Sequence, residues 1–176
     1  MAVKYSPTSA PDLRLLADIR ALLAEVFGEG FTEQDWQNTC GGLHALAWRG
    51  DELIGHGSIV PRRFLYRDRT LRTGYVEAMA VRAGWRRQGH GTALMEQLED
   101  VLRASYDFGA LTSSVGAEPF YASRPWSAWQ GPVSVLAPHG VEETRLEREL
   151  YVFVQPADSI DVSERLTCDW RKGDLW

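Results

Sequence analysis

The amino-acid sequence predicts an α/β fold of the α+β kind, with a central mixed, mostly antiparallel sheet flanked by helices. Three observations predict this class. The chain has 176 residues, of which 44% are hydrophobic and 24% charged, as is usual for one globular domain. Two turn signals join long extended segments in the first half of the chain, which favours antiparallel neighbours. A strand–helix–strand pattern follows, which adds parallel pairing.

The N-terminal segment predicts one strand and two helices. Apolar residues recur at helical spacing from Leu15 to Phe27, which indicates an amphipathic helix. Serine is a preferred N-cap, and glycine often ends a helix. The expected elements are a strand at Val3–Tyr5, a helix capped by Ser9 and ended by Gly28, and a short helix begun by Thr32 and Asp35 and ended by Gly41-Gly42.

The next segment predicts three antiparallel strands, at Leu43–Arg49, Glu52–Tyr66 and Leu71–Val81. Gly50-Asp51 and Arg67-Asp68-Arg69 are the two turn signals between them.

The second half predicts helices alternating with short strands. No linker or repeat divides the chain, so we expect residues 1–176 to form a single domain, with 157–176 as a C-terminal extension. The expected elements are a helix at Gly91–Ala104, a strand at Gly109–Ser113, a short helix at Pro119–Ser123, and strands at Val133–Leu136 and Leu150–Val154.

Composition excludes several classes of function. The net charge of −5 argues against nucleic-acid binding, which needs a basic face, and is compatible with a cationic small molecule. No apolar run reaches the roughly 20 residues of a membrane helix, and no secretory signal is visible, so we expect a cytoplasmic protein. Cys40 and Cys168 are expected to be ordinary thiols, although the sequence leaves a long-range disulfide open. The histidines lack metal-ligand spacing, so we expect no metal site.

The connection between the third predicted strand and its helix carries the pattern Arg-x-x-Gly-x-Gly, from Arg86 to Gly91. Two glycines allow a tight turn, and the helix that follows points free N–H groups and its positive dipole end at one place. Such a turn suits a pyrophosphate. The dinucleotide pattern GxGxxG fails because Leu94 replaces its third glycine. The simpler alternative is an ordinary strand-to-helix turn.

The segment Arg86-Arg87-Gln88-Gly89-His90-Gly91 resembles the acetyl-CoA loop of the GCN5-related N-acetyltransferases, the GNAT superfamily. Further segments resemble the aminoglycoside 2'-N-acetyltransferases within it. These segments are Gly41-Gly42-Leu43-His44-Ala45, Gly74-Tyr75-Val76-Glu77-Ala78-Met79, Tyr121-Ala122-Ser123-Arg124 and the tail from Cys168 to Trp176. The resemblance implies a GNAT-like fold, acetyl-CoA as cosubstrate without a metal, an aminoglycoside substrate, a role in antibiotic resistance and a homodimer.

The resemblance also implies site residues. Glu77 would take the amine proton, through water, and Tyr121 would donate a proton to the CoA sulfur. Without the resemblance, Glu77 would be expected on a solvated face or in an ion pair, and Tyr121 would be expected as an aromatic residue in the core or covering it. The implied cofactor-binding residues are Met79, Ala80, Val81, Arg86, Arg87, Gln88, Gly89, His90, Gly91 and Thr92. The implied substrate-binding residues are Gly30, Asp35, Glu77, Ala78, Thr112, Asp174 and Trp176.

Two departures from the family pattern bear on the substrate. Gly30 stands where the family often has aspartate, and 145–149 replaces an acidic loop. We expect a gentamicin or tobramycin type of aminoglycoside, or an atypical one such as kasugamycin. The tail predicts that a docked Trp176 brings its carboxylate beside Asp174, so that two negative charges face the substrate. Two alternatives stay open: acetylation of another amine, either a polyamine or a protein N-terminus, and a non-catalytic acyl-CoA-binding protein.

Overall fold

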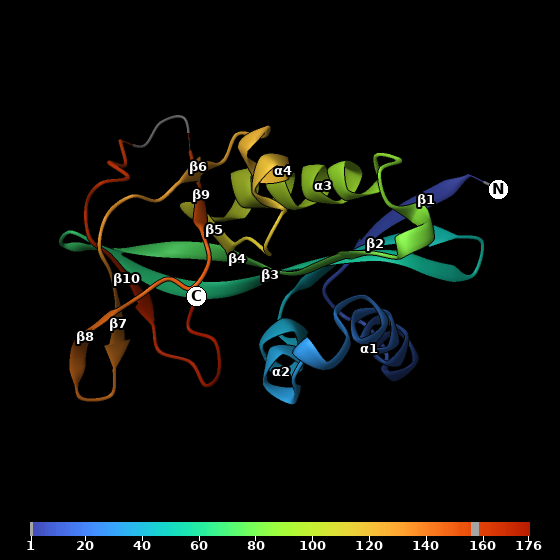
Figure 1. Cartoon of the computed structure of the whole chain (residues 1–176), viewed down its shortest axis with the longest axis horizontal. Coiled ribbons are helices and arrows are strands. Elements are labelled where there is room, and N and C mark those ends of the chain that lie inside the picture. The colour runs from blue at the N-terminus through green and yellow to red at the C-terminus, as the bar shows by residue number, and fades with distance from the viewer. Residues whose placement is uncertain (1, 156–158) are drawn as a thin grey trace. The chain divides into compact units, whose positions relative to one another are not determined.

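The computed structural model describes residues 2–155 and 159–176, so residues 157 and 158 of the expected C-terminal extension lie outside the described residues. The helices are α1 (Leu13–Phe27), α2 (Glu33–Cys40), α3 (His90–Ser105) and α4 (Glu118–Ala122), with 3₁₀ turns η1 (Gly28–Gly30) and η2 (Ala83–Trp85) (Figure 1). The strands are β1 (Val3–Thr8), β2 (Leu43–Arg49), β3 (Glu52–Tyr66), β4 (Arg69–Val81), β5 (Phe108–Thr112), β6 (Ser127–Ala128), β7 (Val133–Ala137), β8 (Gly140–Thr144), β9 (Leu150–Val154) and β10 (Leu166–Asp169).

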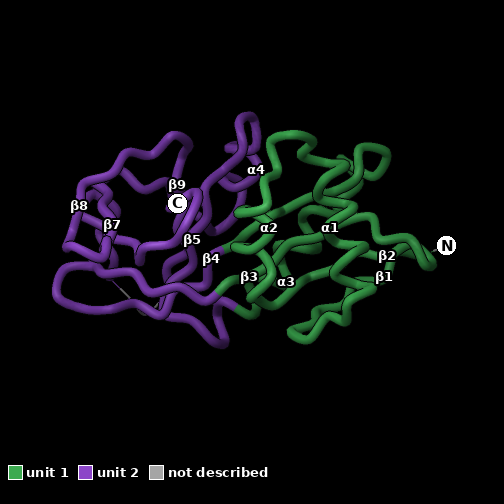
Figure 2. The backbone as a smooth tube through the Cα atoms, turned by 90° about the horizontal axis from the view of Figure 1, so that it is seen from below, with its two compact units in different colours: residues 1–60, 76–101 green, residues 61–75, 102–176 purple. Residues whose placement is uncertain are grey.

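The chain forms two compact units, which Figure 2 colours separately. Unit 1 comprises residues 1–60 and 76–101, and unit 2 comprises residues 61–75 and 102–176. The boundaries fall inside β3 and β4 and inside α3.

Unit 1 is an antiparallel meander covered by helices. β1 pairs with β2, and β2 pairs with β3 across the Gly50-Asp51 turn, with a bulge at Ala47. Helices α1 and α2 lie on one face of these strands and α3 on the other (Figure 1). A Cβ on Gly57 would lie 2.2 Å from Met79 Sδ and 3.0 Å from Leu98 Cδ1, so glycine is required there for the close packing of this layer. The core under α1 consists of Ile19, Leu22, Leu23, Leu46, Leu53 and Ala80.

Unit 2 adds the parallel pairs that make the sheet mixed. β5 runs parallel to β4 and antiparallel to β9, and β10 runs parallel to β7 and antiparallel to β3. An aromatic core fills this unit. Its largest members include Phe64, Tyr75, Phe108, Trp129 and Trp176.

The predicted fold class is confirmed, and the bounds of β2, β3 and β9 are those the sequence predicts. The expected Ser9 cap is wrong. Helix α1 begins at Leu13, and Asp12 is its N-cap, because the Asp12 carboxylate accepts the Leu15 N–H at 2.8 Å. The sequence prediction also missed β6, β8 and β10. No helix among the described residues is long and apolar enough to cross a membrane.

Candidate functional site

The connection between β4 and α3 forms a tight turn that exposes the start of a helix. Arg87 and Gly89 adopt positive φ values of 60° and 86°. The first main-chain bond of α3 joins Ala93 N–H to Gly89 O at 3.0 Å, so the N–H groups of residues 90–92 precede the helical ladder. A Cβ on Gly89 would meet no atom within 4 Å, so glycine is required there for its conformation and not for space.

Side chains of the turn brace its main chain. Arg86 Nε donates to Val81 O at 2.9 Å, and Gln88 Nε2 donates to Gly84 O at 3.0 Å. Arg86 and Arg87 are exposed, so their charge lies at the surface beside the N-terminus of α3. Free N–H groups, a positive helix end and two guanidinium groups together fit a pyrophosphate.

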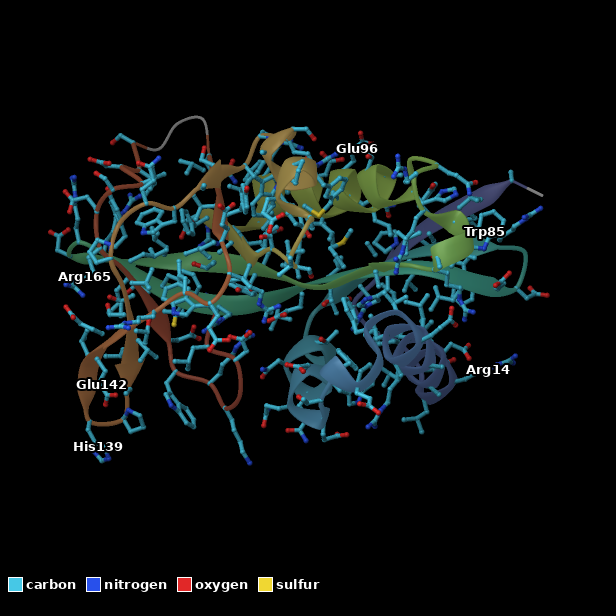
Figure 3. The ribbon with its side chains drawn as sticks, viewed as in Figure 1. Arg14, Trp85, Glu96, His139, Glu142 and Arg165 are labelled. Carbon is cyan, nitrogen blue, oxygen red and sulfur yellow. The ribbon has the colours of Figure 1, made fainter. Side chains whose placement is uncertain are left out.

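The side chain of His90 is buried in unit 1 and contacts other side chains of that unit. Its ring is buried, and Nδ1 lies 2.7 Å from the Tyr5 hydroxyl. The ring also packs near Trp85, which stands in η2 (Figure 3). Arg49 stacks on the indole of Trp85, with its Cζ 4.5 Å from the ring centre. The His90 side chain therefore anchors the start of α3 to β1, which leaves its main-chain N–H for a ligand.

The last part of β4 carries the other residues predicted for the reaction centre. Glu77, Ala78, Met79 and Val81 are half-buried, and Ala80 is buried. Ala78 has φ 49°, a left-handed conformation in the middle of a strand. Non-glycine residues in this region cost of order 1–3 kcal/mol and concentrate at functional sites. The strand is therefore locally strained beside Glu77.

Tyr121 belongs to unit 2, in the short helix α4. Only 6% of the residue is exposed, and its ring packs against Phe120 and Tyr151 with centroids 5.2 and 5.7 Å away. Burial raises the pKa of its hydroxyl to about 12. The hydroxyl is therefore protonated throughout the physiological range, as a proton donor must be.

The C-terminal tail is docked into unit 2 through Trp176, which is buried as the sequence predicts. Its indole packs edge-on against Phe64, and Nε1 donates to Thr144 Oγ1 at 3.0 Å. Thr112 Oγ1 donates to a main-chain oxygen of Trp176 at 3.2 Å. Two residues predicted for substrate binding, Thr112 and Trp176, thus lie together.

Asp174 does not present the unneutralised charge that the sequence suggested. Its Oδ2 lies 2.7 Å from Arg148 Nη2, and its Oδ1 accepts the Trp176 N–H at 3.2 Å. An ion pair therefore offsets its charge. The tail and the 145–148 segment border a cavity of about 360 Å³. Its lining residues are Thr112, Thr144, Arg145, Glu147, Arg148, Gly173, Asp174, Leu175 and Trp176.

Asp35 and Gly30 lie in unit 1 at the start of α2 and in η1. The Asp35 carboxylate forms a capping box, since its Oδ2 accepts the Thr32 N–H and the Thr32 hydroxyl at 2.8 Å each. Thr32 and Asp35 therefore start α2 as predicted. One carboxylate oxygen of Asp35 is already used in the capping box. Gly30 is exposed.

Comparison with known proteins identifies the family. The model of the acetyltransferase (GNAT) family matches residues 15–124. An aminoglycoside 2'-N-acetyltransferase of Mycolicibacterium fortuitum is 45% identical over 174 residues, which cover 96% of this chain and 89% of that protein. The chain belongs to the aminoglycoside 2'-N-acetyltransferase family, within the GNAT superfamily.

Solved structures share the fold of this chain at low sequence identity. Escherichia coli ElaA matches with a TM-score of 0.64 at 19% identity, over 86% of this chain and 99% of that one. An acyl-CoA N-acyltransferase from Pseudomonas aeruginosa matches with a TM-score of 0.63 at 14% identity, over 87% and 100% of the two chains.

The described residues contain no group of histidine, cysteine and carboxylate side chains that could hold a metal ion. Cys40 and Cys168 are free thiols. Burial raises the pKa of Cys168 to about 11, which makes it a poor nucleophile.

Sequence reasoning missed four polar residues of these two units: Arg62, Arg148, His44 and His56. Arg62 is buried and hydrogen-bonds the tail, and Arg148 pairs with Asp174. The sequence does hold a signal for Arg62, because a charged residue at an inward position of an apolar strand is unusual and indicates a buried polar partner. The spacing of His44 and His56 along the chain gives no signal, because their pairing depends on strand register.

Proposed function

We propose that this protein transfers the acetyl group of acetyl-CoA to the 2'-amino group of an aminoglycoside antibiotic and so confers resistance. The similarity to the Mycolicibacterium fortuitum enzyme over 96% of the chain carries this proposal. The turn at Gly89 supports it, because its helix N-terminus, open space and exposed arginines fit the pyrophosphate of CoA.

Acetyl-CoA, when bound, supplies the acetyl group as a thioester. Glu77 accepts the amine proton through a water molecule as the carbon–nitrogen bond forms. The N–H groups of Met79 and Val81 hold the thioester carbonyl and the pantetheine arm. Tyr121 donates its proton to the sulfur as the carbon–sulfur bond breaks, so CoA leaves as the thiol.

The substrate is a polycation, which suits the net charge of −5 and carboxylates such as Asp35 and Asp174. Asp174 is paired with Arg148, so an ammonium group binding there must displace a guanidinium group. The absence of an acidic residue at Gly30 and the neutralisation of Asp174 each favour an aminoglycoside with fewer positive charges. The proposal includes gentamicin and tobramycin types, and the reduced negative charge favours the smaller kasugamycin among them.

The test is release of free thiol from acetyl-CoA with a panel of amines. Kanamycin B and kanamycin A form a matched pair, because the first has an amine and the second a hydroxyl at the 2' carbon. We expect turnover with kanamycin B, tobramycin, gentamicin or kasugamycin and none with kanamycin A. Preference for spermidine or for a peptide N-terminus would favour the other-amine alternative, and no turnover of any amine would favour an acyl-CoA-binding protein.

A further inference from the structure

Two fully buried histidines in unit 1 form a hydrogen-bonded chain that ends on β4. His44 in β2 and His56 in β3 are both 0% exposed. His44 Nδ1 lies 2.9 Å from His56 Nε2, and His56 Nδ1 lies 2.9 Å from the carbonyl oxygen of Ala78. The two residues are diagonal neighbours in the hairpin, since His44 pairs with Ser58 and His56 with Leu46.

The partners fix the proton positions on both rings. A carbonyl oxygen only accepts, so His56 Nδ1 must carry the proton that it donates to Ala78. His56 Nε2 then accepts, and His44 Nδ1 must donate to it. Burial lowers the pKa of His56 to about 3 and lowers that of His44 as well, so both rings are neutral at working pH. The chain therefore has one direction and ends in a donor aimed at Ala78.

The carbonyl that receives this bond belongs to a strained residue. Ala78 has φ 49°, whereas a strand residue has φ near −120°, a difference of roughly 170°. Rotation about the N–Cα bond of Ala78 turns the peptide that carries Glu77 against the peptide that carries Met79. An alanine keeps such a conformation only where its surroundings hold it there. The hydrogen bond from His56 is a specific contact that does so.

We propose that His56, oriented by His44, is a positioning residue for acetyl transfer, which holds Ala78 in the left-handed conformation and so fixes the directions of the Glu77 side chain and the Met79 N–H group. This rests on the proposed function, which gives Glu77 and Met79 their parts in the reaction. The histidines do not touch the substrate. They act through the main chain of β4.

The test compares two nearly isosteric substitutions. In His56→Asn the amide N–H₂ takes the place of Nδ1 and still donates to Ala78, whereas His56→Leu removes the donor. With the aminoglycoside that the wild type turns over fastest, we expect His56→Leu to lower kcat about 10- to 100-fold, as expected for misplaced catalytic groups. His56→Asn should stay within about threefold of wild type. The Kd for CoA, measured by calorimetry, should stay within about threefold in both, since the turn at Gly89 is intact.

A double-mutant cycle separates positioning from general destabilisation. Glycine adopts positive φ without penalty, so Ala78→Gly should reduce the effect of His56→Leu on kcat. The reduction should reach at least about fivefold, which corresponds to ~1 kcal/mol, the lower end of the left-handed penalty for alanine. Equal losses in the alanine and glycine backgrounds would overturn the proposal, as would wild-type kcat in a folded His56→Leu protein.

A structural readout does not depend on catalysis. The ¹³C chemical shifts of Ala78 report its backbone conformation, and we expect a left-handed signature in the wild type and in His56→Asn. Retention of that signature in His56→Leu would overturn the proposal even if the protein acetylated no amine. If His56→Leu does not fold, His56→Asn decides alone: loss of the left-handed signature in a folded His56→Asn protein would refute the assignment of the donor. Absence of wild-type turnover would instead refute the proposed function.

Discussion

Arg62 is the buried cation that ties the C-terminal tail to β3, and replacing it by methionine tests how much this tie contributes. Its guanidinium donates from Nε to Asp169 Oδ1 at 2.8 Å, from Nη2 to Asp169 O at 2.7 Å and from Nη1 to Leu175 O at 2.7 Å. Its side chain is 3% exposed, and its Cζ lies about 5 Å from the ring centres of Phe64 and Tyr75. Arg62→Met keeps the apolar stem and removes all three donors.

The expected destabilisation follows from these contacts. Breaking a buried ion pair costs about 3–5 kcal/mol when the remaining charge stays buried. The Asp169 side chain is 38% exposed, so water can hydrate its carboxylate, and the loss falls to about 3 kcal/mol. For a chain of this length 1 kcal/mol shifts Tm by about 2–4 °C, so Arg62→Met should lower Tm by roughly 6–12 °C.

Thermal unfolding by calorimetry measures this shift, and the neighbouring Arg63 is the matched control. Arg63 is exposed, and its substitution by methionine should change Tm by no more than about 2 °C. Because Leu175 is released, the aminoglycoside KM of Arg62→Met should rise more than its acetyl-CoA KM. A Tm for Arg62→Met equal to that of Arg63→Met would show that the tail does not depend on this contact.

Four further outcomes follow from the same geometry. Gly89→Val should raise the Kd for CoA at least about fivefold while the fold survives, because valine avoids φ 86°; unchanged affinity by calorimetry would remove the turn from the cofactor site. Tyr121→Phe should lower kcat about 10²–10⁴-fold with little change in either KM, and wild-type turnover would make the residue structural. Burial keeps the Tyr121 hydroxyl protonated up to about pH 12, whereas the unfolded chain loses this proton near pH 10, so the folded wild type loses stability as pH rises from 10 to 12. The free energy of unfolding of Tyr121→Phe should therefore fall less steeply with pH than that of the wild type between pH 10 and 12. Equal slopes for the two proteins in alkaline denaturation would contradict this. Deleting Asp174–Trp176 should raise the aminoglycoside KM about tenfold and leave the acetyl-CoA KM nearly unchanged, whereas equal damage to both KM values with a lower Tm would make the tail a core seal.

The fold was predictable where local signals are strong. The Gly50-Asp51 turn predicts where β2 ends and β3 begins, and the apolar run at Leu150–Val154 predicts β9. Strand β8, Gly140–Thr144, is exposed and has no apolar alternation, so it depends on its partner β7. Strand β10 has only four residues and pairs in parallel with β7, which no local pattern indicates.

The candidate site was predictable where a motif lies in one segment, as at Gly89 and its helix. Contacts between distant segments were not. Arg62 meets Leu175 across 113 residues, and Asp174 meets Arg148 across 26. The pairing of His44 with His56 requires the hairpin register, including the bulge at Ala47, which shifts the pairing by one residue. The ion-pair and hydrogen-bond partners of these side chains can therefore be identified only from the folded structure.

Acetylation of the 2'-amino group is tested most directly by locating the acetyl group in the product. The protein is incubated with acetyl-CoA and its fastest aminoglycoside substrate, and the purified product is examined by fragmentation mass spectrometry and by two-dimensional NMR. We predict a single added acetyl group, with its carbonyl carbon correlated to the proton on the 2' carbon. An acetyl group on any other nitrogen, or on oxygen, would contradict the proposed regiochemistry, and an unmodified aminoglycoside would contradict the proposed activity.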